Sequence, residues 1–177
     1  MERDLWVFGY GSLLWNQGFP HVEQSLATLQ GYHRSFCMRS IHHRGTDEAP
    51  GLVLALDAAE GASCRGVAYR VDPDHHAPTM DYLRERELIS SAYLERVLPL
   101  DLADGRRVDA VAYVIDADHV QYCHLDLDEQ ARIISQAVGG RGPNTEYLYN
   151  TASHLTEAGI EDPDLTWLAR EVRRLTA

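Results

Sequence analysis

The distribution of apolar segments limits the possible folds of this chain more than any other feature of its sequence. In the first two thirds, short apolar or alternating runs are bounded by Gly, Pro, Asp or Asn, a pattern typical of β-strands. We expect strands over residues 5–8, 32–38, 52–56, 64–71, 92–100 and 108–115. No long helical pattern separates most of them. This argues against repeated βαβ units and favours an antiparallel or mixed sheet, curled into a small barrel.

Helical patterns are concentrated in the last third of the chain. There we expect helices over residues 127–138, 144–158 and 163–176. Asp126 followed by Glu129 resembles a capping box at the start of the first one. One further helix, over residues 77–88, interrupts the strands. A chain of 177 residues has an ordinary length for one domain, so we predict a single α+β domain over residues 1–177.

The overall charge bears on the classes of partner that this chain can bind. Its formal net charge is −11, which disfavours nucleic acids and anionic membranes, because both are bound through basic surfaces. No apolar run approaches the roughly 18 residues of a membrane helix, so we expect no membrane span. Glu2 and Asp4 occupy the region where a signal peptide would carry basic residues, so we expect no signal peptide.

The cysteines indicate a cellular compartment. Cys37, Cys64 and Cys123 are odd in number and far apart in the sequence, which argues against a disulfide framework. We interpret them as reduced thiols and predict a cytoplasmic protein. No pattern in the sequence indicates an oligomeric state.

The stretch V-F-G-Y-G-S-L-L-W at residues 7–15 places two glycines at the end of a predicted strand. Without Cβ atoms, consecutive N–H groups there can turn inward and hold an oxygen atom of a ligand. A bulge or a tight turn is the alternative. The stretch lacks the third glycine of a dinucleotide fingerprint, the lysine of a P-loop and the G-x-S-x-G context of a nucleophilic serine.

A carboxylate follows the apolar stripe of the helix predicted over residues 77–88. Ala77, Met80 and Leu83 have helical spacing, and Glu87 is the next position on the same face, whereas Glu85 points away. Burial and the negative end of the helix dipole would both raise the pKa of Glu87. A carboxyl group tuned in this way suits general acid–base catalysis. Alternatively, the helix frays before Glu87 and the side chain reaches water.

The nine histidines do not indicate a metal site. Two adjacent pairs, His42-His43 and His75-His76, have no accompanying cysteine pair or His-x₃-His spacing, so we predict no metal. We expect His75-His76 to lie in a solvated turn. The segment His43-Arg44-Gly45 follows a predicted strand and either positions a polar group or forms a surface turn.

Taken together and in order, seven segments resemble the ChaC-like γ-glutamylcyclotransferases over nearly the whole chain. They are V-F-G-Y-G-S-L-L-W (7–15), H-R-G-T (43–46), P-G-L-V (50–53), G-V-A-Y-R-V (66–71), Y-L-R-E-R-E (82–87), G-R-G-P-N-T-E-Y-L (140–148) and L-T-E-A-G-I-E-D-P-D-L (155–165). Each segment alone is a weak signal, but their order and spacing make the group specific.

The resemblance implies a small β-barrel with surrounding helices, no cofactor, and release of 5-oxoproline from a γ-glutamyl compound. The usual substrate of this family is glutathione, and the other product is then cysteinylglycine. The resemblance also implies residue roles. Glu87 would be the catalytic carboxylate, and the loop formed by Tyr10, Gly11, Ser12 and Leu13 would hold the γ-glutamyl group. Arg39 and Tyr147 match positions near the substrate.

The chain departs from the family pattern at a few positions. His42 stands where an acidic residue is expected, Asp47 stands where proline is expected, and Leu88-Ile89-Ser90 is an unusual continuation after Glu87. None of these changes touches the glycine loop or Glu87, so they bear on the substrate more than on the reaction. Two alternatives stay open: a cyclotransferase for a γ-glutamylamine or γ-glutamyl amino acid, and a protein that binds a γ-glutamyl metabolite without cleaving it.

Overall fold

The computed structural model describes residues 4–88 and 91–177, so Glu2, Ile89 and Ser90 lie outside the described residues. The chain forms two compact units. Unit 1 comprises Met1–Arg34 and Leu56–Asp116, and unit 2 comprises Ser35–Ala55 and Ala117–Ala177. The single domain expected from the sequence stays a prediction.

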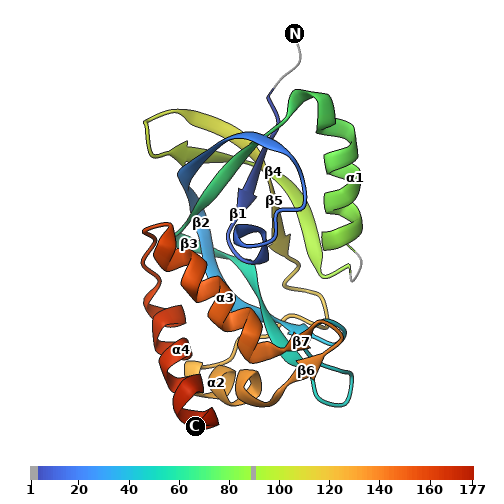
Figure 1. The fold of residues 1–177 in the computed structure, drawn as a ribbon, viewed down its shortest axis with the longest axis vertical. Coiled ribbons are helices and arrows are strands. Elements are labelled where there is room, and N and C mark those ends of the chain that lie inside the picture. The colour runs from blue at the N-terminus through green and yellow to red at the C-terminus, as the bar shows by residue number, and fades with distance from the viewer. Residues whose placement is uncertain (1–3, 89–90) are drawn as a thin grey trace. The chain divides into compact units, whose positions relative to one another are not determined.

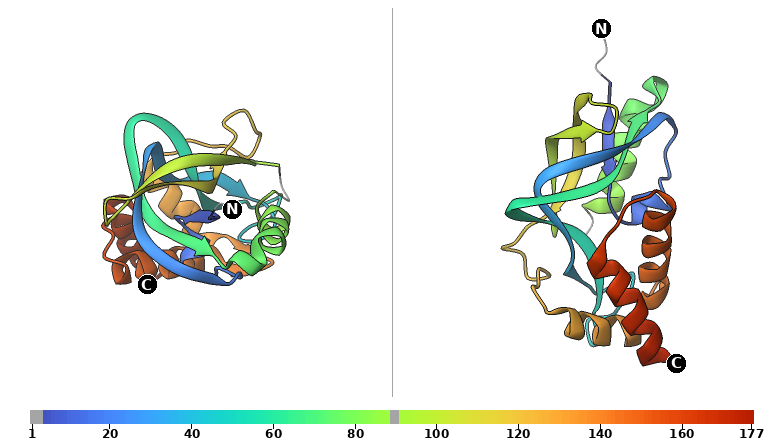
Figure 2. Two further views of the ribbon diagram at one scale, coloured as in Figure 1. Left: turned by 90° about the horizontal axis from the view of Figure 1, so that it is seen from above. Right: turned by 90° about the vertical axis from the view of Figure 1, so that its left-hand side faces the viewer.

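Five strands form a closed barrel in the order β1-β3-β2-β4-β5, with an additional pairing between β3 and β5 (Figures 1 and 2). They are β1 (Trp6–Gly9), β2 (His21–Ser40), β3 (Gly51–Val71), β4 (Tyr93–Leu102) and β5 (Arg107–Ile115). β1 runs antiparallel to β3 and parallel to β5, whereas β4 and β5 are antiparallel. The predicted α+β fold with a small mixed barrel is therefore confirmed.

β1 has a partner strand on each edge, and its side chains are also buried. Trp6, Val7 and Phe8 are at most 3% exposed. A strand that is covered on both faces reads as a continuous apolar run in the sequence. β1 ends at Gly9, so the barrel fixes the starting point of the glycine loop and of the 3₁₀ turn η1 (Ser12–Leu14) that follows.

Two of the predicted strands are parts of one long strand. The prediction of separate strands over residues 52–56 and 64–71 is wrong, because β3 runs without interruption from Gly51 to Val71. Gly61 lies within this strand with φ +82°, and its missing Cβ would point into open space. A single left-handed glycine lets a strand bend while its pairing continues, as in glycine-type bulges. The sequence interpretation placed this glycine in a connection between two strands.

Helix α1 (His76–Glu87) follows the short turn η2 (Pro73–His75) and matches the predicted helix over residues 77–88. Its predicted buried stripe is partly wrong. Leu83 is fully buried, but Ala77 is exposed, and Thr79 is buried instead. Few residues of α1 are apolar, so polar side chains complete its inner face, and apolar spacing alone does not locate that face.

Unit 2 contains three helices that contact one another, α2 (Leu127–Gln136), α3 (Asn144–Glu157) and α4 (Pro163–Thr176) (Figure 1). The side chain of Asp126 caps α2 by accepting a hydrogen bond of 2.9 Å from the Glu129 N–H. α2 ends before the predicted residue 138, because β6 (Val138–Gly139) pairs with β7 (Gly142–Pro143). No helix in the described part of the chain is long and apolar enough to cross a membrane.

Candidate active site

The loop after β1 is a tight turn. The Leu14 N–H donates to the Gly11 carbonyl at 2.9 Å, and the Asn16 N–H donates to the Ser12 carbonyl at the same distance. The N–H groups of Ser12 and Leu13 precede the first of these hydrogen bonds. A helical turn leaves its first N–H groups without an acceptor inside the turn. The structure thus bears out the tight turn, and the backbone groups that were expected to meet a ligand lie at its start.

Gly9 makes room for an aromatic ring. A Cβ atom on Gly9 would lie 2.9 Å from Cε2 of Tyr69 and 3.3 Å from Cβ of Leu13. The Tyr69 hydroxyl donates to the Leu13 carbonyl at 3.4 Å and accepts from Gln17 Nε2 at 3.1 Å. Burial raises the pKa of Tyr69, which keeps the hydroxyl protonated. Close packing therefore accounts for Gly9, and of the two glycines only Gly11 is left for a role in ligand binding.

Tyr10 is anchored at both its side chain and its backbone. Its hydroxyl donates to the carbonyl of Tyr113 on β5 at 3.0 Å. Its own carbonyl accepts from Nε of Arg34, a residue that is 4% exposed, at 2.8 Å. These contacts fix the start of the loop against the barrel.

Glu87 occupies the last position of α1. The helix does not fray before it, because the Leu88 N–H still donates to the Arg84 carbonyl at 2.9 Å. The Glu87 side chain is 14% exposed, whereas Glu85 is exposed, as predicted. The expectation that the pKa of Glu87 is raised stays a prediction.

Arg86 connects the loop to Glu87 within unit 1. Its Nε lies 3.3 Å from Oε1 of Glu87, and its NH2 group donates to Oγ of Ser12 at 2.8 Å. Its NH1 group donates to the Tyr82 hydroxyl at 3.1 Å and to the Asn16 carbonyl. The structure thus brings the predicted loop and the predicted carboxylate together through a residue that sequence reasoning missed. The available signal was an arginine directly before an inward-facing glutamate at a helix end.

A second arginine of the same helix pairs with a glutamate of β4. Arg84 Nε and NH2 contact the two carboxylate oxygens of Glu95 at 3.0 and 3.1 Å. The hydrogen bond from Arg84 is the main cause that lowers the pKa of Glu95, so this carboxylate is ionised. The buried hydroxyl of Tyr113 donates to Glu95 at 2.9 Å. Burial, followed by this contact and by the charges of Glu95 and Glu87, raises the pKa of Tyr113, which therefore stays neutral.

Arg39 belongs to unit 2, where its backbone is tied to a neighbouring segment. The Arg39 N–H donates to the Gln121 carbonyl at 2.7 Å, and Gln121 Nε2 donates to the Arg39 carbonyl at 2.8 Å. Its guanidinium also acts on Cys123: burial raises the pKa of this thiol, and the charge of Arg39 opposes the shift.

Tyr147 also belongs to unit 2, where it attaches α3 to β3. Its hydroxyl accepts a hydrogen bond from the Leu54 N–H at 3.1 Å. One helical turn earlier, the Asn144 side chain accepts from the Leu52 N–H at 2.7 Å and donates to the Leu52 carbonyl at 2.8 Å. The two side chains thus continue the hydrogen bonding of β3. Sequence reasoning missed Asn144, because an amide at a helix start reads as an ordinary cap.

Arg44 is the polar group that the His43-Arg44-Gly45 segment positions. It is 4% exposed, which contradicts the alternative of a surface turn. It donates to the Pro143 carbonyl at 3.0 Å, and its guanidinium lies 5.8 Å from the centre of the Tyr147 ring. Burial lowers the pKa of Arg44, and the charge of Glu146 opposes the shift.

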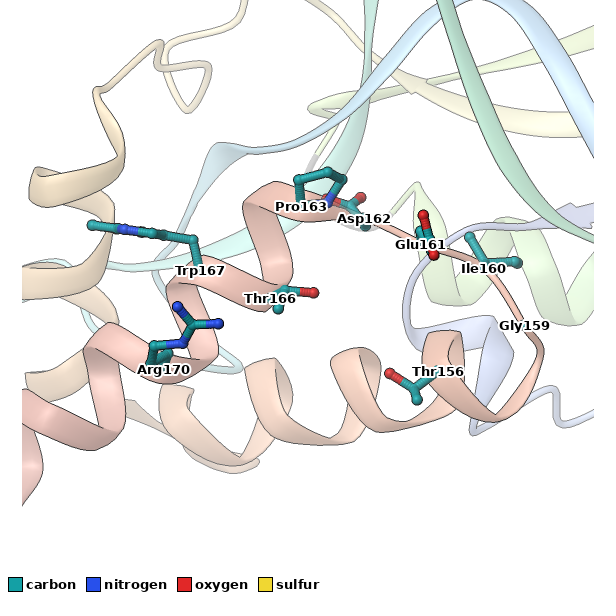
Figure 3. A pocket seen from close by; sticks show the side chains of 9 residues that line it. All are labelled: Thr156, Gly159, Ile160, Glu161, Asp162, Pro163, Thr166, Trp167 and Arg170. Carbon is teal, nitrogen blue, oxygen red and sulfur yellow. The ribbon is translucent and has the colours of Figure 1, made fainter.

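Unit 2 also contains an open pocket of about 670 Å³ between the end of α3 and the start of α4 (Figure 3). It is lined by Thr156, Gly159, Ile160, Glu161, Asp162, Pro163, Thr166, Trp167 and Arg170. Neither Arg39 nor Tyr147 lines this pocket. Across residues 4–88 and 91–177, no group of three or more His, Cys, Asp or Glu side chains is placed to hold a metal ion.

Residues 5–175 match the sequence model of the family described as ChaC-like protein. The glutathione-specific gamma-glutamylcyclotransferase of Escherichia coli K12 is 37% identical over 99% of this chain and 76% of its own length. Gamma-glutamylcyclotransferase 2-3 of Arabidopsis thaliana is 33% identical over 97% of this chain and 89% of its own length.

Solved structures show the same fold. The glutathione-specific cyclotransferase from yeast superposes with a TM-score of 0.87, at 24% identity, over 98% of this chain and 97% of its own. A second structure, described as a gamma-glutamyl cyclotransferase, gives a TM-score of 0.60 at 15% identity over 94% of this chain and 86% of its own. With a family match over almost its full length, the chain belongs to the ChaC-like protein family.

Proposed function

We propose that this chain is a glutathione-specific γ-glutamylcyclotransferase, which cleaves glutathione into 5-oxoproline and cysteinylglycine. The names of the Escherichia coli and Schizosaccharomyces pombe relatives, 37% and 33% identical to this chain, support glutathione as the substrate. One observation of the structure supports the proposed type of reaction. The Glu87 carboxylate and the Ser12 loop contact the same guanidinium, that of Arg86, so an acid–base group and a set of backbone donors lie close together.

The reaction is intramolecular. The α-amine of the γ-glutamyl group attacks its own γ-carbonyl carbon, and a new carbon–nitrogen bond closes the five-membered ring. The bond from this carbon to the cysteinyl nitrogen then breaks. One proton moves from the attacking amine to the departing nitrogen, and no water is consumed. Because the nucleophile is part of the substrate, the reaction requires no cofactor and no activated serine or cysteine.

Glu87 is the residue that we propose to move this proton. Free α-amines titrate near pH 8, so much of the substrate amine is protonated at neutral pH and cannot attack. The Glu87 carboxylate accepts the proton and delivers it to the cysteinyl nitrogen as the ring closes. Its place at the inner end of α1, with 14% of the side chain exposed, leaves it open to a substrate while removing most of the surrounding water.

The loop of Tyr10, Gly11, Ser12 and Leu13 is the proposed cradle of the γ-glutamyl group. The N–H groups at the start of its turn can hold the substrate carboxylate or the developing oxyanion. One such donor is typically worth about 3 kcal/mol in a transition state. The contacts that fix Tyr10 and Leu13 hold the loop in place before the substrate arrives, and a fixed geometry is what an intramolecular reaction needs.

On the strength of the family resemblance, we also propose Arg39 and Tyr147 as substrate-binding residues. A guanidinium suits a carboxylate, and glutathione carries two. We also propose a cytoplasmic location. The odd number and wide spacing of Cys37, Cys64 and Cys123 argue against a disulfide framework, which is usual where thiols are kept reduced.

A substrate panel tests this proposal. The purified protein is incubated separately with reduced glutathione, a γ-glutamyl amino acid and a γ-glutamylamine, and the products are quantified by mass spectrometry. We expect equal amounts of 5-oxoproline and cysteinylglycine from glutathione, and much less 5-oxoproline from the other two compounds. Efficient turnover of another γ-glutamyl compound would reassign the substrate, and binding of glutathione without any turnover would favour a binding protein.

A further inference from the structure

We infer that Arg86 is a positioning residue, which holds the glycine loop at a fixed place relative to the Glu87 carboxylate. This inference rests on the proposed function for its catalytic meaning. The contacts by which one guanidinium couples the loop to the carboxylate do not depend on the identity of the substrate.

The contacts of Arg86 spread over three parts of unit 1. Its NH2 group holds the side chain of Ser12 at the start of the turn, and its NH1 group holds the backbone of Asn16 at the end. Its Nε faces Glu87 at 3.3 Å. A guanidinium is planar and rigid, so groups bound to its different nitrogens are fixed relative to one another. Arg86 therefore fixes the position of the loop relative to the Glu87 carboxylate.

Burial distinguishes Arg86 from an ordinary surface cation. Its side chain is 9% exposed, whereas that of Arg84, two residues earlier, is 52% exposed. A cation that is mostly removed from water must have its donors satisfied, because its desolvation is costly. Charge interactions in such a place are also screened less than those at the surface. The loop and Glu87 supply the acceptors that keep Arg86 in its inward position.

The direction of the hydrogen bond to Ser12 has a chemical consequence. Arg86 can only donate, so the Ser12 oxygen acts as acceptor in this pair. The hydroxyl hydrogen of Ser12 is then directed to a different acceptor, and a carboxylate oxygen of the γ-glutamyl group fits that role. Arg86 thereby sets the orientation in which Ser12 can serve the proposed cradle.

Arg86 also offsets an unfavourable position of Glu87. The C-terminal end of a helix carries a partial negative charge, which disfavours an ionised carboxylate there. A guanidinium beside the carboxylate favours the charged form, which is the form that accepts a proton. Arg86 and Arg84 are the two basic residues in the last turn of α1, but Arg84 is paired with Glu95 instead.

Tyr82, which packs against Gly18, is a further contact that holds Arg86 in place. The Tyr82 hydroxyl accepts from Arg86 NH1 at 3.1 Å. A Cβ atom on Gly18 would lie 2.0 Å from this hydroxyl oxygen, and Gly18 has φ +75°. The ring of Tyr82 therefore packs directly on the backbone of Gly18, at a position that only glycine allows without displacement.

The test compares Arg86→Met with Arg84→Met, which removes a guanidinium from the same helix but leaves the loop contacts intact. Hydrogen exchange of the Leu14 and Asn16 amides reports on the loop without any substrate. We expect exchange to accelerate about tenfold or more in Arg86→Met, because hydrogen bonds to a charged group are lost. With glutathione, we expect kcat to fall about 100-fold, as for a misplaced catalytic group, and KM to change less. Arg84→Met should change neither readout appreciably.

Arg86→Lys separates positioning from charge, and it retains a cation if Arg86→Met fails to fold. Lysine presents a point charge in place of a planar fork, so we expect it to preserve folding but to recover only part of the lost kcat and amide protection. Full recovery by lysine, or unchanged amide exchange in both Arg86 variants, would overturn the inference. If the wild-type chain does not cleave glutathione, the proposed function fails, while the exchange measurement still decides whether Arg86 couples the loop.

Discussion

α1 supplies the arginine of two arginine–glutamate pairs, and contact distances alone do not show which pair matters more. Arg84 and Glu95 form the better ion pair, with two contacts of 3.0 and 3.1 Å, but their side chains are 52% and 25% exposed. Arg86 and Glu87 have one contact of 3.3 Å, yet both side chains are largely covered. Exposed pairs contribute little to stability, however good their geometry.

The difference lies in what each pair connects. The first pair joins α1 to β4 and accepts a hydrogen bond from the Tyr113 hydroxyl. These three side chains form a small hydrogen-bonded network. The guanidinium of the second pair also contacts Ser12 and Asn16, so a carboxylate at a helix end is tied to the turn that follows β1. Under our proposal, the second pair serves the reaction and the first serves the fold.

We expect the largest difference between the two pairs when their carboxylates are replaced. Glu87→Gln removes the group that moves the proton, so we expect kcat for glutathione to fall by about 10²–10⁴-fold, the usual contribution of general acid–base catalysis. Glutathione binding, measured by calorimetry, should be largely retained. Glu95→Gln is the matched control and should have only a small effect on kcat. Near-normal turnover in Glu87→Gln would remove this residue from the mechanism.

Gly11→Val tests whether the loop bound by Arg86 holds the substrate. A branched side chain at Gly11 fills the space in which the γ-glutamyl group is expected to meet the backbone. We expect glutathione binding to be lost in calorimetry while the thermal unfolding transition is retained. Gly61→Val is the control for binding: valine at this positive φ should lower stability, but glutathione binding should be retained, because Gly61 faces open space in β3. Unchanged binding by Gly11→Val would contradict the cradle.

Gly18→Ala should disturb the Arg86 pair without touching Arg84. Both Gly18 and Gly61 have a positive φ, so alanine at either site costs about 1–2 kcal/mol in backbone strain. Only at Gly18 would the new Cβ also displace Tyr82, the support of Arg86. We expect Gly18→Ala to lose more stability than Gly61→Ala in denaturant unfolding, and kcat to fall further in Gly18→Ala than in Gly61→Ala. Equal kcat values would show that Tyr82 does not act through Arg86.

The smallest effect is expected from the pH dependence of the Glu95 pair. Arg84 is the main cause that lowers the pKa of Glu95 below its ordinary value of 4.5, and Tyr113 adds to it. A carboxyl group with a lowered pKa stabilises the fold above its unfolded pKa, and this contribution is lost as the pH falls. The thermal stability of Glu95→Gln should therefore be slightly below that of the wild type at neutral pH. The difference should begin to shrink as the pH falls below 4.5 and should vanish once the pH is below the lowered pKa of Glu95 in the folded protein. A difference that persists in acid would point to packing instead of charge.

Much of the fold follows from local patterns in the sequence. The buried run before Gly9, the Asp126 cap and the helix through Glu87 all depend on short-range rules, and each is found in the structure. The continuity of β3 through Gly61 was not predicted, because a glycine inside a strand and a glycine at its end look alike in sequence.

The site was predicted less completely than the fold. Loop and carboxylate were each found by their departure from an apolar pattern, whereas Arg86 and Asn144 act through long-range contacts, across 74 and 92 positions. Such contacts leave no local periodic signal. Gly9 shows the opposite error, since a close approach of the Tyr69 ring was interpreted as a bare backbone for a ligand.

The central claim is that the substrate amine, and not water, displaces cysteinylglycine. The most direct measurement is the wild-type reaction with reduced glutathione in ¹⁸O-labelled water, with all products followed by mass spectrometry. The account predicts unlabelled 5-oxoproline and cysteinylglycine in equal amounts. Free glutamate carrying ¹⁸O would show hydrolysis and would contradict the account.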